Sequence, residues 1–71
     1  MTDAQRDALR WFSEHQGDGV FAGRGGTLLA GGEIAPHTRS TFNALISAGY
    51  VEKYGRKRIR LTDAGKMAVA A

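Results

Sequence analysis

A dense run of positive charge lies between residues 53 and 60, where no acidic residue occurs: Lys53, Arg56, Lys57, Arg58 and Arg60. Guanidinium and ammonium groups bind phosphate oxygens through charge-assisted hydrogen bonds, so this spacing predicts contact with a phosphate backbone. We expect the strongest contacts from Arg56 and Arg58, at or near the turn that Gly55 and Arg56 indicate. The alternative is a solvated edge strand, whose charges prevent pairing with another sheet edge. The Tyr54 hydroxyl either donates a hydrogen bond to phosphate or packs on the sheet.

The preceding segment, residues 38–48, combines an apolar stripe with side chains that can read base edges. Phe42, Leu45 and Ile46 recur at helical spacing and predict its buried side. The other side offers short or planar polar groups: Thr38, Arg39, Ser40, Asn43 and Ser47. Arginine pairs bidentately with guanine, and asparagine with adenine, in the major groove. We therefore predict base contacts from Arg39 and Asn43, four residues apart on one helix face; the alternative is a merely solvated face.

Other arrangements that support chemistry in proteins are incomplete in this sequence. The stretch Gly-Arg-Gly-Gly at 23–26 suggests a phosphate-binding loop, but no helix beginning with Lys-Ser or Lys-Thr follows it. We expect a turn there, with Arg24 as a further candidate for a backbone contact. His15 and His37 lack carboxylate or cysteine partners at metal-ligand spacing, and no nucleophile–base or carboxylate pair has a pocket. These patterns predict no metal site, no cofactor and no enzyme.

Charge and composition limit the class of protein. The 71 residues correspond to one domain, residues 1–71, with a net charge of +3. Residues 1–36 carry three basic and five acidic side chains, whereas residues 37–60 carry six basic and one acidic. This local concentration favours a docking surface for a polyanion. With no cysteine, no signal-peptide pattern and no apolar run near the roughly 20 residues of a membrane span, the sequence predicts a cytoplasmic protein with no membrane contact.

Two helices and a glycine-rich hairpin are expected in the first two thirds of the chain. Apolar spacing predicts a first helix over residues 3–16, with a capping box from Thr2 and Gln5. Most of the ten glycines fall in residues 17–33. They predict strands at 20–22 and 27–30 around a turn, or a second helix reduced to a turn at 33–36. The next helix, 38–48, is expected to hold Pro36 in its first turn, with its cap before Pro36 or at His37 or Thr38.

The last third predicts a β-hairpin and a short helix over residues 63–70, capped by Thr62. One strand begins at residues 50–51. In the next, alternation places Lys57, Ile59 and Leu61 on an inward face and Arg58 and Arg60 on the outward face. The predicted core contains eight apolar side chains: Leu9, Phe12, Phe42, Leu45, Ile46, Val51, Ile59 and Leu61.

Two stretches resemble the winged helix-turn-helix superfamily. Residues 41–52, Thr-Phe-Asn-Ala-Leu-Ile-Ser-Ala-Gly-Tyr-Val-Glu, are similar to its recognition helix and exit strand. Residues 61–65, Leu-Thr-Asp-Ala-Gly, are similar to the corner that follows its wing. The resemblance covers residues 34–66 and implies an α+β domain with three helices, a small sheet with a C-terminal β-hairpin wing, and double-stranded DNA as the usual ligand. The glycine-rich residues lie where this family has its second helix, so we expect either an extra hairpin in place of that helix or its reduction to a turn.

The sequence therefore predicts sequence-specific binding of double-stranded DNA by a small transcriptional regulator or a phage-type accessory factor. One such helix reads only a few base pairs, so we expect a homodimer on repeated half-sites, with the Trp11 side of the first helix as the dimer face. The alternative is a protein-binding module, such as a small phage-encoded inhibitor of the anti-CRISPR type, whose basic face meets an acidic partner. An exposed patch at Trp11 and Phe12 would favour this alternative.

Overall fold

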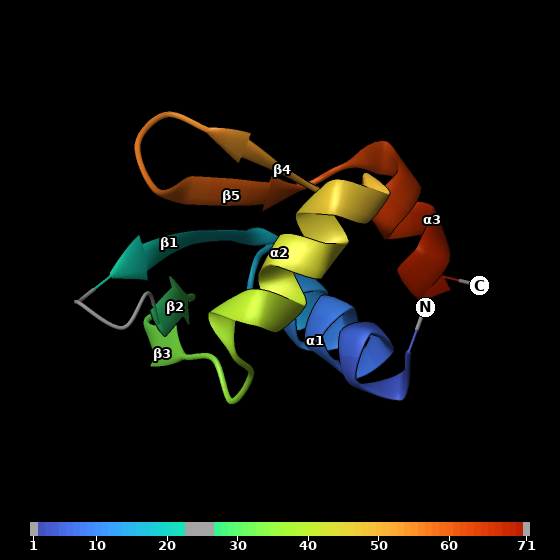
Figure 1. Cartoon of the computed structure of the whole chain (residues 1–71), viewed down its shortest axis with the longest axis horizontal. Helices are drawn as coiled ribbons and strands as arrows, with labels where there is room; N and C mark the ends of the chain where they lie inside the picture. The colour runs from blue at the N-terminus through green and yellow to red at the C-terminus, as the bar shows by residue number, and fades with distance from the viewer. Residues whose placement is uncertain (1, 23–26, 71) are drawn as a thin grey trace.

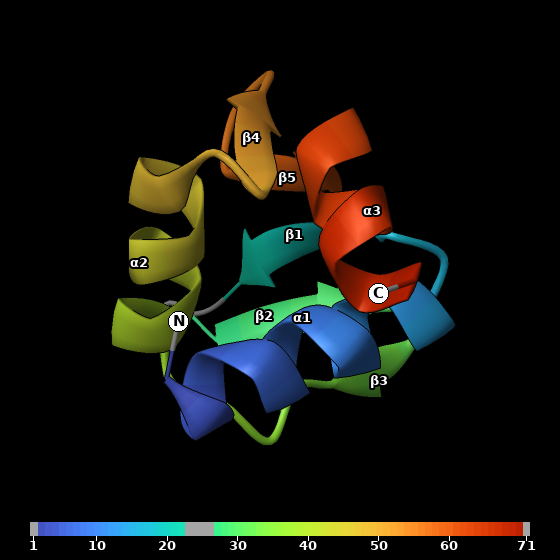
Figure 2. The same ribbon diagram turned by 90° about the vertical axis from the view of Figure 1, so that its right-hand side faces the viewer.

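A five-stranded antiparallel sheet and three helices make up the parts of the chain that the computed structural model describes, residues 2–22 and 27–70. The helices are α1 (Asp3–Glu14), α2 (Arg39–Ala48) and α3 (Asp63–Ala70). The sheet has the order β3-β2-β1-β5-β4, formed by β1 (Asp18–Ala22), β2 (Thr27–Ala30), β3 (Glu33–Ile34), β4 (Val51–Tyr54) and β5 (Arg58–Leu61). In Figures 1 and 2, α1 packs against both α2 and α3, and α2 packs against β4. The α+β class expected from the sequence is confirmed.

Helix α1 begins as predicted and ends two residues early. The Thr2 side chain accepts a hydrogen bond from the Gln5 amide, and the Gln5 side chain accepts one from the Thr2 amide, which completes the capping box. At the other end His15 is the C-cap, and Gln16 has a φ of 76°, in the left-handed region. A helix cannot continue through that conformation, so the prediction that it reaches Gln16 is wrong.

The glycine-rich segment forms strands that join the C-terminal hairpin in one sheet. β1 pairs with β2 as expected, while the connection at residues 23–26, which includes Arg24, lies outside the described residues. β3 follows β2 and pairs with it, so the reduced helical turn considered for residues 33–36 is not the structure formed. β1 also pairs with β5. The expectation of a wing with a separate extra hairpin is therefore corrected to a single five-stranded sheet.

Helix α2 is positioned by caps at both ends. The Thr38 side chain accepts a hydrogen bond from the Thr41 amide at 3.4 Å, so the helix starts at Arg39 and the prediction that Pro36 lies in its first turn is wrong. Ala35 is anchored before the helix, because its amide donates to the Leu28 carbonyl at 2.8 Å. Gly49 ends the helix with a φ of 85°, which glycine adopts without strain.

The corner between β5 and α3 explains the Leu-Thr-Asp-Ala-Gly pattern. The Thr62 hydroxyl donates to the Gly49 carbonyl at 2.7 Å and accepts from the Gly65 amide at 3.1 Å, so it caps α3 and ties it to the end of α2. The carbonyl of Tyr50 approaches Gly65 so closely that a Cβ atom there would overlap it. A glycine at this position therefore lets α3 pack directly on the chain that leads into β4.

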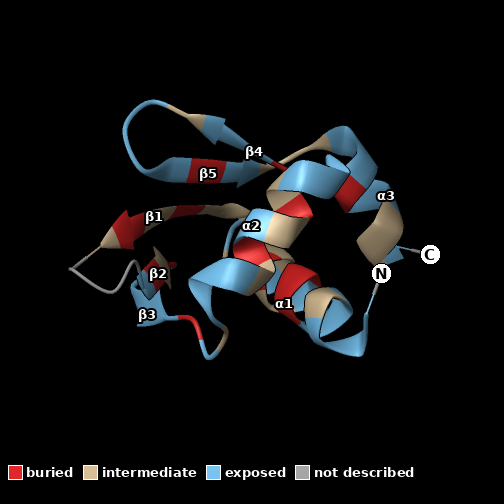
Figure 3. Cartoon of the chain, in the orientation of Figure 1, coloured by how far each residue is buried: buried red, intermediate tan, exposed pale blue. Residues whose placement is uncertain are grey.

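The hydrophobic core lies between the helices and one face of the sheet (Figure 3). Six of the eight predicted core side chains are buried, and Ile46 and Leu61 are half-buried at its margin. The rings of Phe12 and Phe42 meet edge to face with centroids 6.1 Å apart and join α1 to α2. The glycine-rich strands add core residues that the sequence did not identify: Phe21, Leu28 and Ala30.

The other face of the sheet carries exposed or half-buried side chains, and we call it the open face. Residues paired across an antiparallel sheet share a face. The register therefore places two groups on the open face: apolar Val20, Leu29 and Ile34 towards β3, and Asp18, Glu52, Tyr54, Arg58 and Arg60 towards β4. Ile34 is 68% exposed.

Candidate nucleic-acid interface

Helix α2 presents a polar stripe to solvent. Ser40, Asn43 and Ser47 are exposed, whereas Phe42 and Leu45 on the other side are buried. The ten residues of α2 include no acidic side chain. Ten helical residues span about 15 Å, and the major groove of DNA is about 12 Å wide. Short polar side chains without negative charge allow a helix of this size to approach base edges closely.

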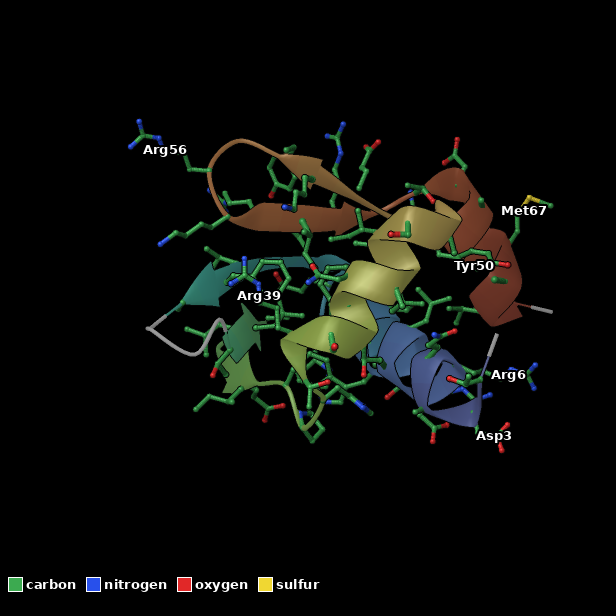
Figure 4. The ribbon with its side chains drawn as sticks, in the orientation of Figure 1. Asp3, Arg6, Arg39, Tyr50, Arg56 and Met67 are labelled. Atoms are coloured by element: carbon green, nitrogen blue, oxygen red, sulfur yellow. The ribbon has the colours of Figure 1, made fainter. Side chains whose placement is uncertain are left out.

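Arg39 lies where α2 meets the sheet. Its guanidinium carbon is 5.3 Å from the ring centroid of Phe21, a cation–π distance, and Phe21 belongs to the helix-covered face of β1. Figure 4 shows Arg39 projecting from α2 over β1. Asn43 follows one turn later and is exposed. Arg39 therefore lies on the flank of the polar stripe, towards the sheet, and Asn43 lies within the stripe.

The β4–β5 hairpin carries further positive charge, both on the side that faces α2 and in its turn. Lys53 pairs with buried Ile59, so its side chain leaves β4 on the face that α2 covers. Arg56 and Lys57 are exposed in the turn, and the Phe21 amide donates to the Lys57 carbonyl at 2.7 Å, which fixes the turn against β1. Lys57 has a φ of 58° and lies outside β5, so the prediction that it shares a strand face with Ile59 and Leu61 is wrong.

Tyr54, Arg58 and Arg60 form a separate cluster on the open face. The Tyr54 hydroxyl donates to the carboxylate of Asp18, and this bond raises the pKa of Tyr54. The guanidinium carbons of Arg58 and Arg60 lie 5.6 Å and 5.1 Å from the Tyr54 ring centroid. Arg60 also donates from Nε to Glu52 Oε1 at 2.6 Å, which raises the pKa of Arg60. These side chains hold β4, β5 and β1 together.

The ten residues predicted as a DNA site therefore divide between two faces. Arg58, Arg60 and Tyr54 share the open face, and Thr38 is occupied as the cap of α2. We define the α2–turn surface as the exposed groups of α2, the α2-side residue of β4 and the basic residues of the β4–β5 turn: Arg39, Ser40, Asn43, Ser47, Lys53, Arg56 and Lys57. Glu52 points to the open face, so the acidic residue of the hairpin is directed away from this surface. In Figure 4, Arg39 and Arg56 lie at the end opposite to Asp3, Arg6 and Met67.

Metal-binding groups, membrane-spanning helices and pockets are the other features that could indicate a site. Within residues 2–22 and 27–70, no three His, Asp or Glu side chains are grouped to hold a metal ion. None of the three described helices is both long and apolar enough to cross a membrane. Two shallow hollows share Arg60, Leu61 and Lys66, and each also contains an acidic side chain, Asp18 in one and Glu52 and Asp63 in the other.

A contact between His15 and Glu33 was missed by the sequence. His15 Nε2 lies 2.5 Å from Glu33 Oε2, although the two residues are 18 positions apart. Their proximity depends on the turn between β2 and β3, which no local spacing pattern reports.

No family model, curated protein or solved structure matches this chain. The assignment of a function therefore depends on the geometry and charge of its surfaces.

Proposed function

We propose that this chain binds double-stranded DNA in a sequence-specific manner, with α2 in the major groove and the β4–β5 turn against the backbone. The observation that supports this most strongly is the α2–turn surface, where an acid-free polar stripe is flanked by Arg39, Lys53, Arg56 and Lys57. Sequence-specific DNA-binding proteins combine these two kinds of group, because phosphate contacts fix the position of the protein on the duplex and base contacts give specificity.

The groups of this surface other than Ser47 contact either bases or phosphates in this proposal. Asn43 bonds bidentately to adenine, and the Ser40 hydroxyl bonds to a base edge or a phosphate. Lys53, Arg56 and Lys57 contact phosphates on the side of the groove nearest the hairpin. Arg39 is braced by Phe21 and reaches a guanine or a phosphate at the groove edge. Arg58 and Arg60, on the open face, contribute to DNA binding only through long-range electrostatic attraction.

The order of elements also supports a winged-helix-like regulator. A helix is followed by a basic hairpin, and β5 of that hairpin pairs with a strand that follows α1. In this proposal β1, β2 and β3 take the place of the usual second helix as the brace for α2. Contacts from this region reach α2 through Phe21 under Arg39 and through Ala35 before the cap.

A matched pair of variants tests the proposal. Bound sites are first selected from random duplex DNA, and affinity for the selected duplex is then measured across a series of salt concentrations. Arg56→Ala and Arg58→Ala each remove one positive charge from the same hairpin, the first from its turn and the second from the open face. We expect Arg56→Ala to lower the slope of log affinity against log salt by about 1, because one phosphate contact is lost. Arg58→Ala should leave it nearly unchanged, because the Debye length is only about 8 Å at physiological salt.

Two outcomes would contradict the proposal. Equal slopes for the two variants would mean that the hairpin acts only as a diffuse charge. Failure of the wild-type chain to enrich any duplex would instead favour the alternative, in which the basic surface docks on an acidic protein.

A further inference from the structure

His15 occupies an unusual position at the C-terminal end of α1. It is the C-cap residue, and its ring stacks on Trp11 with centroids 4.0 Å apart and planes 19° from parallel. Nδ1 lies 2.7 Å from the Trp11 carbonyl oxygen, and Nε2 lies 2.5 Å from Glu33 Oε2 on β3. Both nitrogens of one ring are therefore at hydrogen-bonding distance from oxygen atoms.

The two partners decide the protonation state of the ring. A carbonyl oxygen and an ionised carboxylate only accept hydrogen bonds, whereas a neutral imidazole has one N–H to donate. Both bonds form together only when the ring is an imidazolium. A carboxyl group is in general a stronger acid than an imidazolium, so the proton shared between the two side chains resides on the ring.

The surroundings of His15 favour the same charge. The C-terminal end of a helix carries partial negative charge, and the face of an indole ring attracts cations. Glu14 on α1 and Glu33 on β3 are the charged groups that act on the ring, and Gly31 of the β2–β3 turn, which packs beside it, carries no charge. The hydrogen bond to the Trp11 carbonyl, followed by the contact with Glu33, raises the pKa of His15 above 6.5 despite partial desolvation.

We propose that His15 and Glu33 form a proton-operated clasp that holds the edge strand β3 against the end of α1. β3 has only two residues and pairs with β2 on one side, so it has few other contacts to retain it. It leads directly to Ala35, whose amide bonds to the Leu28 carbonyl, and then to the cap of α2. Loss of the proton leaves one of the two ring nitrogens facing an oxygen without a donor, and the clasp opens.

The sign of the pH effect follows from the raised pKa. The clasp contributes its full stabilisation below pH 6.5, the ordinary value for histidine, and loses it as the pH rises through the higher pKa of the folded protein. β3 and the Ala35 amide should therefore become less protected from hydrogen exchange as the solution becomes more alkaline within that window.

The test uses NMR titration of the His15 ring together with amide protection factors. Glu33→Gln removes the charge of the partner, and Glu14→Gln is the matched control, because it makes the same change in net charge beside His15 without breaking a bond to it. We expect the His15 pKa to fall much further in Glu33→Gln than in Glu14→Gln. We also expect Ala35 protection to depend on pH in the wild-type chain and to lose that dependence in Glu33→Gln.

Several results would overturn the clasp. One is a wild-type His15 that titrates at or below 6.5, and another is an equal shift in the two variants. A third is Ala35 protection that does not change with pH in the wild-type chain. The NMR chemical shifts of the two His15 ring nitrogens test the clasp in the wild-type protein without any substitution, because both nitrogens must carry a proton while the clasp is closed.

Discussion

Asn43 is the residue on which base recognition is expected to depend most. In the proposed complex, replacement by alanine removes a bidentate contact of the kind that discriminates by about 1–3 kcal/mol against the wrong base. We therefore expect Asn43→Ala to relax the preference at one base position, as measured by repeating the site selection, and to leave affinity for unrelated duplexes nearly unchanged.

Ser47→Ala is the control for this change, because Ser47 lies one turn further along the same exposed stripe and its single hydroxyl lacks the paired N–H and C=O groups with which an amide binds adenine. A selected site that is identical for Asn43→Ala and the wild-type chain would remove Asn43 from the reading surface.

At the residue scale, the sequence predicted the chemistry of the side chains better than the surface to which they point. Alternation placed Ile59 inward and Arg58 and Arg60 outward, and this is confirmed. It did not reveal that the outward face is turned away from α2, because that depends on which face of the sheet the helices cover. The left-handed conformation of Lys57 was missed because residues other than glycine rarely adopt it.

Leu45 is one of the two α2 side chains that are buried in the hydrophobic core. Its side chain is 1% exposed, within the core beneath α2. Leu45→Ala should lower the free energy of unfolding by about 2–5 kcal/mol, because it removes buried methyl groups and leaves a cavity. Urea denaturation followed by circular dichroism measures this change.

Exposed Ser47 on the same helix again supplies the comparison, since Ser47→Ala should stay within about 0.5 kcal/mol of the wild-type chain. Equal denaturation midpoints for Leu45→Ala and Ser47→Ala would contradict the packing described for α2.

At the element scale, local patterns predicted most helices and strands but not their neighbours. Caps and apolar spacing located α1, α2 and α3 to within a few residues. The glycines predicted β1 and β2 because they disfavour helix. The pairing of β1 with β5 joins distant parts of the chain, so no window of local sequence contains it. For the same reason the sequence predicted two hairpins where the structure has one sheet.

The whole molecule is small, and its stability should respond strongly to a ligand. A chain of 71 residues buries only about 60% of its unfolded surface, so its margin of stability is narrow. A duplex present at about 100 times its dissociation constant adds about 2.7 kcal/mol. We expect the selected duplex to raise the melting temperature clearly in differential scanning calorimetry at physiological salt.

An unrelated duplex of the same length, at the same concentration, should produce a much smaller rise. If both duplexes raise the melting temperature equally, binding is electrostatic only and the proposal that it is sequence-specific is wrong.

A homodimer on repeated half-sites stays a prediction at this scale. The molecule extends 33 Å along its longest axis, close to the roughly 34–36 Å of one DNA turn. Two copies placed end to end along that axis would therefore offer their α2 helices to successive turns of the same groove. Trp11 is half-buried and stacked on His15, so it offers less free area for a dimer face than its size implies.

The central place of β1 in the sheet has a consequence for how the chain folds. β1 forms one ladder with its neighbour in sequence, β2, and another with β5, from the far end of the chain. The two hairpins are local and close short loops, whereas the β1–β5 ladder must close a long one at a larger entropic cost. Docking of one preformed hairpin on the other should therefore be the late, slow event of folding. Opposite net charges on the two parts of the chain, negative in residues 1–36 and positive in residues 37–60, would accelerate that encounter at low salt.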